Sequence, residues 1–166
     1  KLNISKIDLV VVNLYPFEKF LKAGSSIEDC IENIDIGGPS LIRAAAKNFS
    51  RTAVLVDTCD YEAIINEVKE FGGTSYKLRM KLAARAIART AEYGSMISGW
   101  LSEISDDTPP RRISFSAKFN TQLRYGENPH QGAEVYSINN STNSLVNLKK
   151  LKGKELSFNN YNDLST

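Results

Sequence analysis

The sequence contains few of the residues that mark several common classes of protein. It has one histidine and two cysteines in 166 residues. Cys30 and Cys59 stand alone, without the spacing of metal ligands, so we expect two buried free thiols. The sequence also lacks a Walker-type phosphate loop, a dinucleotide fingerprint, a zinc spacing and a serine-hydrolase elbow. These absences indicate a protein that needs no metal.

Charge and hydrophobicity exclude further classes. The formal net charge is only +2, and basic residues alternate with acidic ones along the chain. This pattern argues against nucleic acid as a partner, although a slight basic excess suits a phosphorylated metabolite. No apolar run is long enough to span a bilayer, and residues 1–7 are too mixed in polarity for a secretory signal. We therefore expect a cytoplasmic protein with no membrane partner.

The first hundred residues alternate between strand and helix patterns, which predicts an α/β fold with a parallel sheet. Two β-branched runs are apolar on both faces, as in buried parallel strands. The predicted strands cover residues 7–14 and 52–56, and the predicted helices cover 26–33, 37–48, 59–71 and 75–103. The apolar stripe of the last helix is expected to pack in the core, through Leu78, Leu82, Ile87, Met96, Ile97 and Trp100.

The composition changes after this long helix. Residues 105–112 are polar and contain two prolines, as in a linker. Beyond them the chain is rich in Asn, Ser and Lys and has three strand-like runs, at 113–119, 133–138 and 144–148. The sequence thus predicts one domain over 1–103, a linker over 104–112 and part of a second domain over 113–166.

A first group of polar residues surrounds a Gly-Gly-Pro turn. Asn13 and Tyr15 follow the first predicted strand, where ligands bind in open α/β sheets. Asp35 precedes the Gly-Gly-Pro helix start and Lys47 lies near that helix's end. An acid, an ammonium and a phenol together can move protons and stabilise an oxyanion. The structural alternative is equally strong on spacing alone: Asp35 caps the helix, Lys47 is solvated and Tyr15 packs.

Two further groups lie in the second half. Arg124 offers a planar fork for a phosphate or carboxylate, and Tyr125 offers a face for a heterocycle. Nearby His130 is the single histidine, which by default is a structural hydrogen-bonding residue. Residues 157–161 supply amides that suit a polar ligand or, equally, an asparagine-rich turn.

Five motifs occur in a fixed order and carry a resemblance to a known family. They are VVNLYPF at 11–17, ENIDIGGPS at 32–40, RAAAKN at 43–48, LRYGENPHQ at 123–131 and GKELSFNN at 153–160. In this order the sequence resembles the bifunctional AICAR transformylase / IMP cyclohydrolase family of purine biosynthesis, from about Ile7 to Asp163. The resemblance implies an internal part of that family's chain.

The resemblance implies two reactions. A formyl group passes from 10-formyltetrahydrofolate, a cosubstrate, to AICAR, and formyl-AICAR then closes to IMP with loss of water. Residues 1–103 would be the second part of a methylglyoxal-synthase-like cyclohydrolase domain. Residues 113–166 would open a cytidine-deaminase-like α/β transformylase domain, in a homodimer that shares its site.

The same resemblance assigns candidate site residues. The catalytic residues of cyclisation would be Tyr15, Asp35 and Lys47. Substrate contacts would come from Asn13, Ile36 and Gly37 in the first site, and from Arg124 and Tyr125 in the AICAR site. The family's catalytic Lys-His pair and its phosphate loop match no residue here, so His130 is not that histidine. These 166 residues alone are therefore expected to turn over neither reaction.

A second class of function stays open. A methylglyoxal-synthase-like segment also suits a regulatory module that binds a phosphorylated metabolite without converting it. Such a sensor has no need of Asp35 together with Lys47. A third class, a scaffold, would bind no nucleotide at all.

Overall fold

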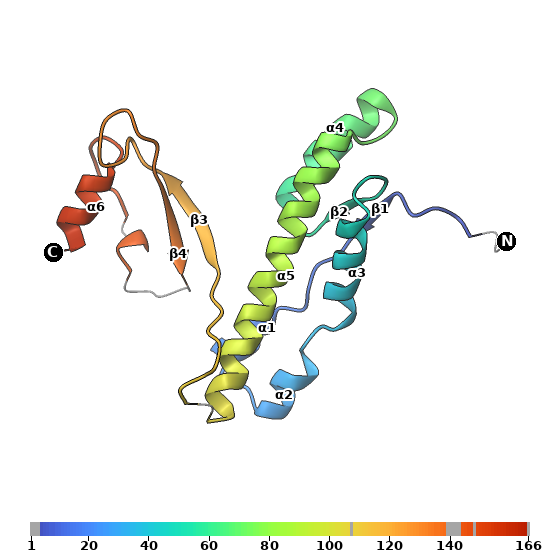
Figure 1. Ribbon diagram of the computed structural model, residues 1–166, viewed down its shortest axis with the longest axis horizontal. Coiled ribbons are helices and arrows are strands. Elements are labelled where there is room, and N and C mark those ends of the chain that lie inside the picture. The colour runs from blue at the N-terminus through green and yellow to red at the C-terminus, as the bar shows by residue number, and fades with distance from the viewer. Residues whose placement is uncertain (1–3, 107, 139–143, 148, 166) are drawn as a thin grey trace. The chain divides into compact units, whose positions relative to one another are not determined.

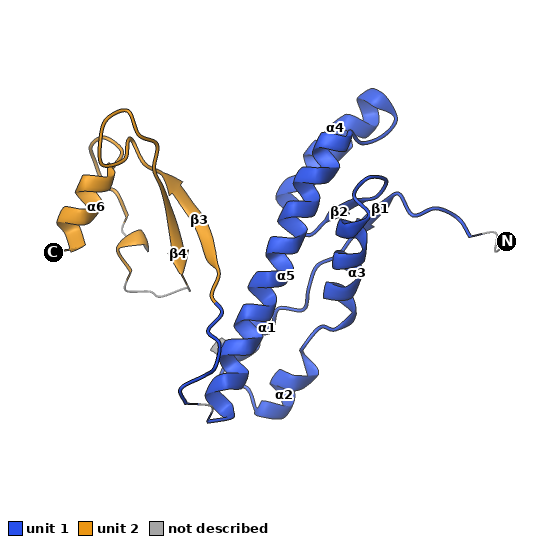
Figure 2. Ribbon diagram, viewed as in Figure 1, with its two compact units in different colours: residues 1–114 blue, residues 115–166 orange. Residues whose placement is uncertain are grey.

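The computed structural model describes residues 4–106, 108–138, 144–147 and 149–165. The chain divides into two compact units, Lys1–Ser114 and Phe115–Thr166 (Figure 2). Within the described residues each unit contains a two-stranded sheet. None of the helices described there is both long and apolar enough to cross a membrane.

The sheet of the first unit is parallel, as the sequence predicts. Strand β1 (Leu9–Val11) pairs with β2 (Ala53–Leu55), with Val10 opposite Val54. The pairing continues past β1, because the Val12 N–H donates to the Leu55 carbonyl at 3.0 Å. The carboxyl ends of both strands therefore lie at one edge of the sheet.

Burial of the two strands differs from expectation. All of β2 is buried, but Leu9 and Val11 of β1 are 46% and 47% exposed. Alternate side chains point to opposite faces, and only Val10 of β1 packs against the helices that cover its face. The prediction that the first strand is buried on both faces is thus wrong for the described chain.

In its described residues the first unit contains helices α1 to α5, which Figure 1 labels. They are α1 (Phe17–Lys22), α2 (Ile27–Glu32), α3 (Gly37–Lys47), α4 (Tyr61–Phe71) and α5 (Tyr76–Ile104), with a 3-10 turn, η1 (Thr58–Asp60). The Ser26 and Ser75 hydroxyls accept backbone N–H bonds at the starts of α2 and α5. Gly72 ends α4 in the left-handed conformation, with φ of 71°. The four predicted helices are confirmed to within a few residues.

Helix α1 is an addition that the sequence did not predict. Pro16 reads as the end of a strand, but it directly precedes α1. Proline suits the start of a helix because its fixed φ is close to helical and its missing N–H would have no partner there. Pro16 therefore both ends the extended segment and starts a helix.

Three apolar clusters hold this unit together. Side chains of α3 and α5 cover one side of Val54, and α4 and α5 cover Ala53 and Leu55. The third cluster joins α1, α2 and α5 through Phe17, Cys30 and Tyr93. Two expectations fail here: Ile87 is 43% exposed, and Cys59 is exposed although Cys30 is buried.

The second unit is an antiparallel pair of strands with a helix. Strand β3 (Ala117–Gln122) pairs with β4 (Glu134–Ile138), and the register is irregular between Phe119 and Thr121. A 3-10 turn, η2 (Leu145–Asn147), and helix α6 (Phe158–Ser165) follow.

Two of the predicted strands in this unit need correction. The first begins four residues later than expected, at Ala117. The strand predicted over 144–148 is wrong, because residues 145–147 form η2, while Leu148 lies outside the described residues. The Val146 N–H donates to the Ser144 hydroxyl at 3.3 Å, a local bond of the kind that competes with strand pairing.

Candidate functional site

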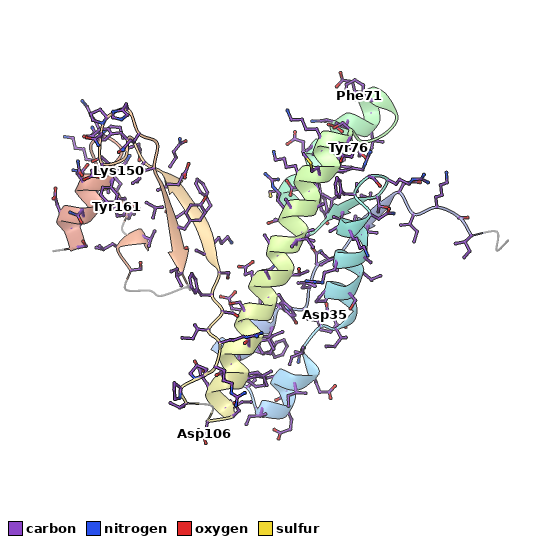
Figure 3. The ribbon with its side chains drawn as sticks, in the orientation of Figure 1. Asp35, Phe71, Tyr76, Asp106, Lys150 and Tyr161 are labelled. Atoms are coloured by element: carbon purple, nitrogen blue, oxygen red, sulfur yellow. The ribbon has the colours of Figure 1, made fainter. Side chains whose placement is uncertain are left out.

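The first candidate site is centred on Asp35, at the entrance to α3 (Figure 3). Its Oδ1 accepts the Gly38 N–H at 2.7 Å, and its Oδ2 accepts the Tyr15 N–H at a longer 3.4 Å. The half-buried carboxylate therefore caps the helix and ties it to the segment after β1. Because a carboxylate offers about four lone-pair positions, two bonds leave room for a ligand.

Glycine at position 38 allows this close approach. A Cβ built there would lie 2.5 Å from Asp35 Oδ2 and 2.8 Å from Leu14 Cδ2. At Gly37 a Cβ would meet no atom within 4 Å. The two adjacent glycines thus differ: Gly38 makes space for the carboxylate, whereas Gly37, like Ile36 before it, is exposed.

Asn13 and Tyr15 lie where the sequence predicts, just beyond the carboxyl end of β1. Asn13 is exposed and the Tyr15 side chain is 54% exposed, so neither is used for packing. Between them, Leu14 packs into the core instead. The exposure of Tyr15 does not support the alternative that it packs in the core, and its backbone N–H donates to Asp35.

Lys47 lies at the opposite end of α3 from Asp35. Lys47 stands ten positions after Gly37, which corresponds to about 15 Å along the helix. Lys47 is exposed and, with Arg43 one turn earlier, lines an open hollow of about 360 Å³ that reaches Ile87. The structure therefore brings Asp35 together with the Tyr15 backbone but does not bring Lys47 beside them.

The second candidate site lies in the other unit. The Arg124 guanidinium stacks over the Tyr125 ring, 4.8 Å from its centre, and its Nη2 lies 3.3 Å from the Tyr125 hydroxyl. Main-chain bonds fix both residues, since the Arg124 N–H donates to the Leu156 carbonyl and the Phe158 N–H donates to the Tyr125 carbonyl. The LRYGENPHQ motif is therefore joined directly to the start of α6.

The loop after Tyr125 is closed by its own polar groups. Gln131 accepts the Asn128 N–H through Oε1, and its carbonyl accepts the Gly126 N–H. A Cβ at Gly126 would lie 2.9 Å from Gln131 Cβ, which explains the glycine. His130 is exposed at this loop.

The asparagine-rich segment forms the beginning of α6. The buried Ser157 donates both its N–H and its hydroxyl to Asn160 Oδ1, at 3.0 Å each. The Asn159 side chain donates to the Glu127 carbonyl at 3.2 Å. These bonds support the structural interpretation of residues 157–161 and link them to the preceding motif.

Two residues that brace the first site were not identified from the sequence. The Tyr93 hydroxyl accepts the Asp35 N–H at 2.8 Å. Arg79 donates to the Phe49 and Ser50 carbonyls, at 2.9 and 3.0 Å, and so holds the turn that follows Lys47. Both belong to α5 and act over long sequence separations, so no local pattern points to them.

The buried Tyr93 is the group of this site whose titration the fold shifts. Burial raises the pKa of Tyr93 above its ordinary value, and the nearby Asp35 charge raises it further, while the hydrogen bond from the Asp35 backbone opposes the shift. No group of three or more His, Cys, Asp or Glu side chains in the described part of the chain is arranged to hold a metal.

Two family models match the parts of the chain that carry these motifs. The family model described as AICARFT/IMPCHase bienzyme matches residues 45–166, and the MGS-like domain model matches residues 1–40. The chain belongs to the AICARFT/IMPCHase bienzyme family. The MGS-like match contains β1 and Asp35, whereas the bienzyme match contains Lys47, Arg124 and Tyr125.

Curated members of this family include proteins named bifunctional purine biosynthesis protein PurH. The chain is 47% identical over 163 residues to that of Listeria monocytogenes serovar 1/2a, covering 97% of this chain and 32% of the relative. The chain is 49% identical over 160 residues to the Parvibaculum lavamentivorans protein and 51% identical over 161 residues to the Bradyrhizobium diazoefficiens protein. Each of these two alignments covers 96% of this chain and 30% of the relative. The chain thus spans about a third of the length of these relatives.

Proposed function

We propose that these residues belong to an enzyme of purine biosynthesis that forms IMP from AICAR in two steps. The first step transfers a formyl group from 10-formyltetrahydrofolate to AICAR, and the second closes formyl-AICAR to IMP. Family membership supports both steps, since the PurH relatives are described as bifunctional purine biosynthesis proteins. We place the protein in the cytoplasm as a homodimer that needs no metal.

The observation that carries the cyclisation proposal is the oriented carboxylate of Asp35. Gly38 and Tyr15 N–H groups fix both of its oxygens beyond the carboxyl end of the parallel sheet. This is where open α/β sheets bind ligands. The exposed residues Ile36 and Gly37, next to Asp35, and the exposed Asn13, just after β1, would supply substrate contacts.

Cyclisation then proceeds within one substrate molecule. The carboxamide nitrogen attacks the formyl carbon and loses one proton to Asp35, while the formyl oxygen takes up a proton and becomes the hydroxyl of a carbinolamine. The former formamide nitrogen then loses its proton, the C=N bond forms, and the hydroxyl leaves as water with a second proton. The two protons that the nitrogens release equal the two that the oxygen takes up. Since both reacting groups are already joined, correct positioning supplies much of the rate.

Tyr15 and Lys47 take different parts of this reaction. Tyr15, whose backbone N–H donates to Asp35 and whose side chain is exposed, supplies a phenol that assists the departing oxygen. The separation of about 15 Å along α3 argues against Asp35 and Lys47 acting on the same atom. Lys47, beside Arg43, instead meets a more distant part of the nucleotide.

Arg124 and Tyr125 would bind AICAR for formyl transfer. Their stacked side chains offer a cation and an aromatic face, the groups that suit a phosphate and a heterocycle. We assign residues 113–166 to the start of a cytidine-deaminase-like transformylase domain and residues 1–103 to a methylglyoxal-synthase-like cyclohydrolase domain, joined by 104–112.

The test separates the two activities in the full-length protein that carries these residues. Asp35→Asn is expected to lower cyclisation at least 100-fold and to leave formyl transfer within twofold, because only the first site loses a proton acceptor. Arg124→Ala is expected to impair formyl transfer, by raising the KM for AICAR, and to leave cyclisation within twofold. Equal loss of both activities in either variant would contradict the assignment. Unchanged cyclisation in Asp35→Asn would contradict the role of Asp35, and IMP binding without any cyclisation by the wild-type protein would favour a regulatory module.

A further inference from the structure

Tyr93 lies beneath the segment that carries Asp35. Its hydroxyl accepts the Asp35 N–H at 2.8 Å and is 3.4 Å from the Asn33 carbonyl, to which it donates. The residue is only 3% exposed, so water does not compete for these bonds. One side chain therefore bridges two backbone groups on either side of Ile34.

The Tyr93 ring is itself held firmly. It meets the buried Phe17 ring edge to face, with centres 6.4 Å apart and planes at 71°. Phe17 in turn meets Trp100 at 5.4 Å, and Cys30 completes the cluster. Because α5 carries both Tyr93 and Trp100, the hydroxyl is presented to the Asp35 segment from a long, continuous helix.

Asp35 is thus constrained at two separate places. The Tyr93 hydroxyl fixes its backbone, whereas the Gly38 and Tyr15 N–H groups fix its carboxylate. The bond from the Tyr15 N–H, at 3.4 Å, is the longest of the three, so by itself it holds the carboxylate loosely at the sheet edge. The shorter backbone bond to the Tyr93 hydroxyl, at 2.8 Å, therefore acts together with it to set where the carboxylate stands.

We propose that Tyr93 is a positioning residue for cyclisation, which acts on the substrate only through Asp35. The inference rests on the proposed function, because it assumes that Asp35 accepts a proton from the substrate. Removing the hydroxyl leaves the Asp35 N–H without its acceptor and lets residues 33–36 shift. A misplacement of about 1 Å at a catalytic group lowers the rate by about 100-fold.

Tyr93→Phe tests this role because it keeps the ring and its packing and deletes one oxygen atom. In the full-length protein we expect kcat for cyclisation to fall 10- to 100-fold, with formyl transfer and the KM for formyl-AICAR within about threefold. The matched control is Tyr61→Phe, since Tyr61 also packs against the core but lies in a different cluster, on α4. This control is expected to leave both activities unchanged.

A double-mutant cycle separates positioning from general stabilisation. If Tyr93 acts through Asp35, Tyr93→Phe has no further effect on kcat once Asp35 is replaced by Asn. Amide hydrogen exchange gives a second readout, with faster exchange expected at Asp35 in Tyr93→Phe and unchanged exchange in α4.

Several results would overturn the inference. These are a loss of less than twofold in Tyr93→Phe, an equal loss of both activities, or the same loss in the Asp35→Asn background as in the wild type. Wild-type cyclisation by Asp35→Asn would instead contradict the proposed function itself. If Asp35→Asn loses cyclisation while Tyr93→Phe keeps the wild-type activity, only the role of Tyr93 is overturned.

Discussion

Replacing Gly38 by alanine adds one methyl group at the most crowded point of the candidate cyclisation site. The new Cβ would stand 2.5 Å from Asp35 Oδ2 and 2.8 Å from Leu14 Cδ2. Since non-bonded heavy atoms are ordinarily about 3.5 Å apart, the carboxylate oxygen must move by about 1 Å. Rotation of the Asp35 side chain relieves the clash most easily, at the expense of its orientation.

The expected effect is therefore larger on activity than on stability. Overpacking costs about 1–3 kcal/mol, and the preference of a helix for alanine over glycine returns about 0.5–1 kcal/mol. We expect the free energy of unfolding to fall by about 0.5–2 kcal/mol. A carboxylate displaced by about 1 Å lowers kcat for cyclisation by about 100-fold.

Gly37→Ala is the matched control for stability, because its Cβ would meet no atom within 4 Å. It is expected to be as stable as the wild type or to gain up to about 1 kcal/mol. Gly94→Ala, on α5 with equally open space, controls for activity. Urea titration and the two enzyme assays in the full-length protein measure both effects. Wild-type stability and cyclisation in Gly38→Ala would refute the reasoning.

Three further predictions concern the framework of the two units. Arg85→Met leaves the buried Asp60 carboxylate without its cation. Urea titration should show a free energy of unfolding lower by about 2–3 kcal/mol. No change would show that water replaces the guanidinium as the partner of Asp60. The Tyr93 pKa is raised in the folded state, so the neutral phenol contributes to the free energy of unfolding. This contribution is fully present below the unfolded-state pKa of about 10 and is lost as pH rises through the folded-state pKa. From pH 9 upward, the urea midpoint should fall less steeply with pH in Tyr93→Phe than in the wild type. The same dependence on pH in both proteins would contradict this. Ser157→Ala removes hydrogen bonds to Asn160 at the start of α6 and should cost about 1 kcal/mol, seen as faster amide exchange in α6 but not in α5.

Elements with strong local signals were predictable from the sequence. Helix α3 follows from Gly-Gly-Pro and its alanines, and α4 ends at Gly72 because only glycine takes a φ of 71° easily. The parallel pairing of β1 with β2 follows from two β-branched runs with helical segments between them. Helix α1 and the turn at η2 were missed, because proline and a Leu-Val pair each suit more than one local structure.

The site was predictable only in part. The positions of Asn13, Tyr15 and Asp35 follow from the rule that ligands bind at the carboxyl ends of parallel strands. Whether Asp35 caps a helix or serves a ligand could not be decided from spacing, and the structure shows that it does cap α3. The Tyr93 contact was invisible because it joins residues 58 positions apart.

Hydrogen exchange of the full-length protein with and without saturating IMP tests the central claim most directly. The claim is that residues 13–15 and 35–47 form one wall of the cyclisation site. IMP should slow amide exchange in these two segments, most strongly at Ile36 and Gly37, which are exposed in the structure without ligand. IMP should leave amide exchange in α4 unchanged. Binding of IMP with no protection of residues 35–47 would contradict the account.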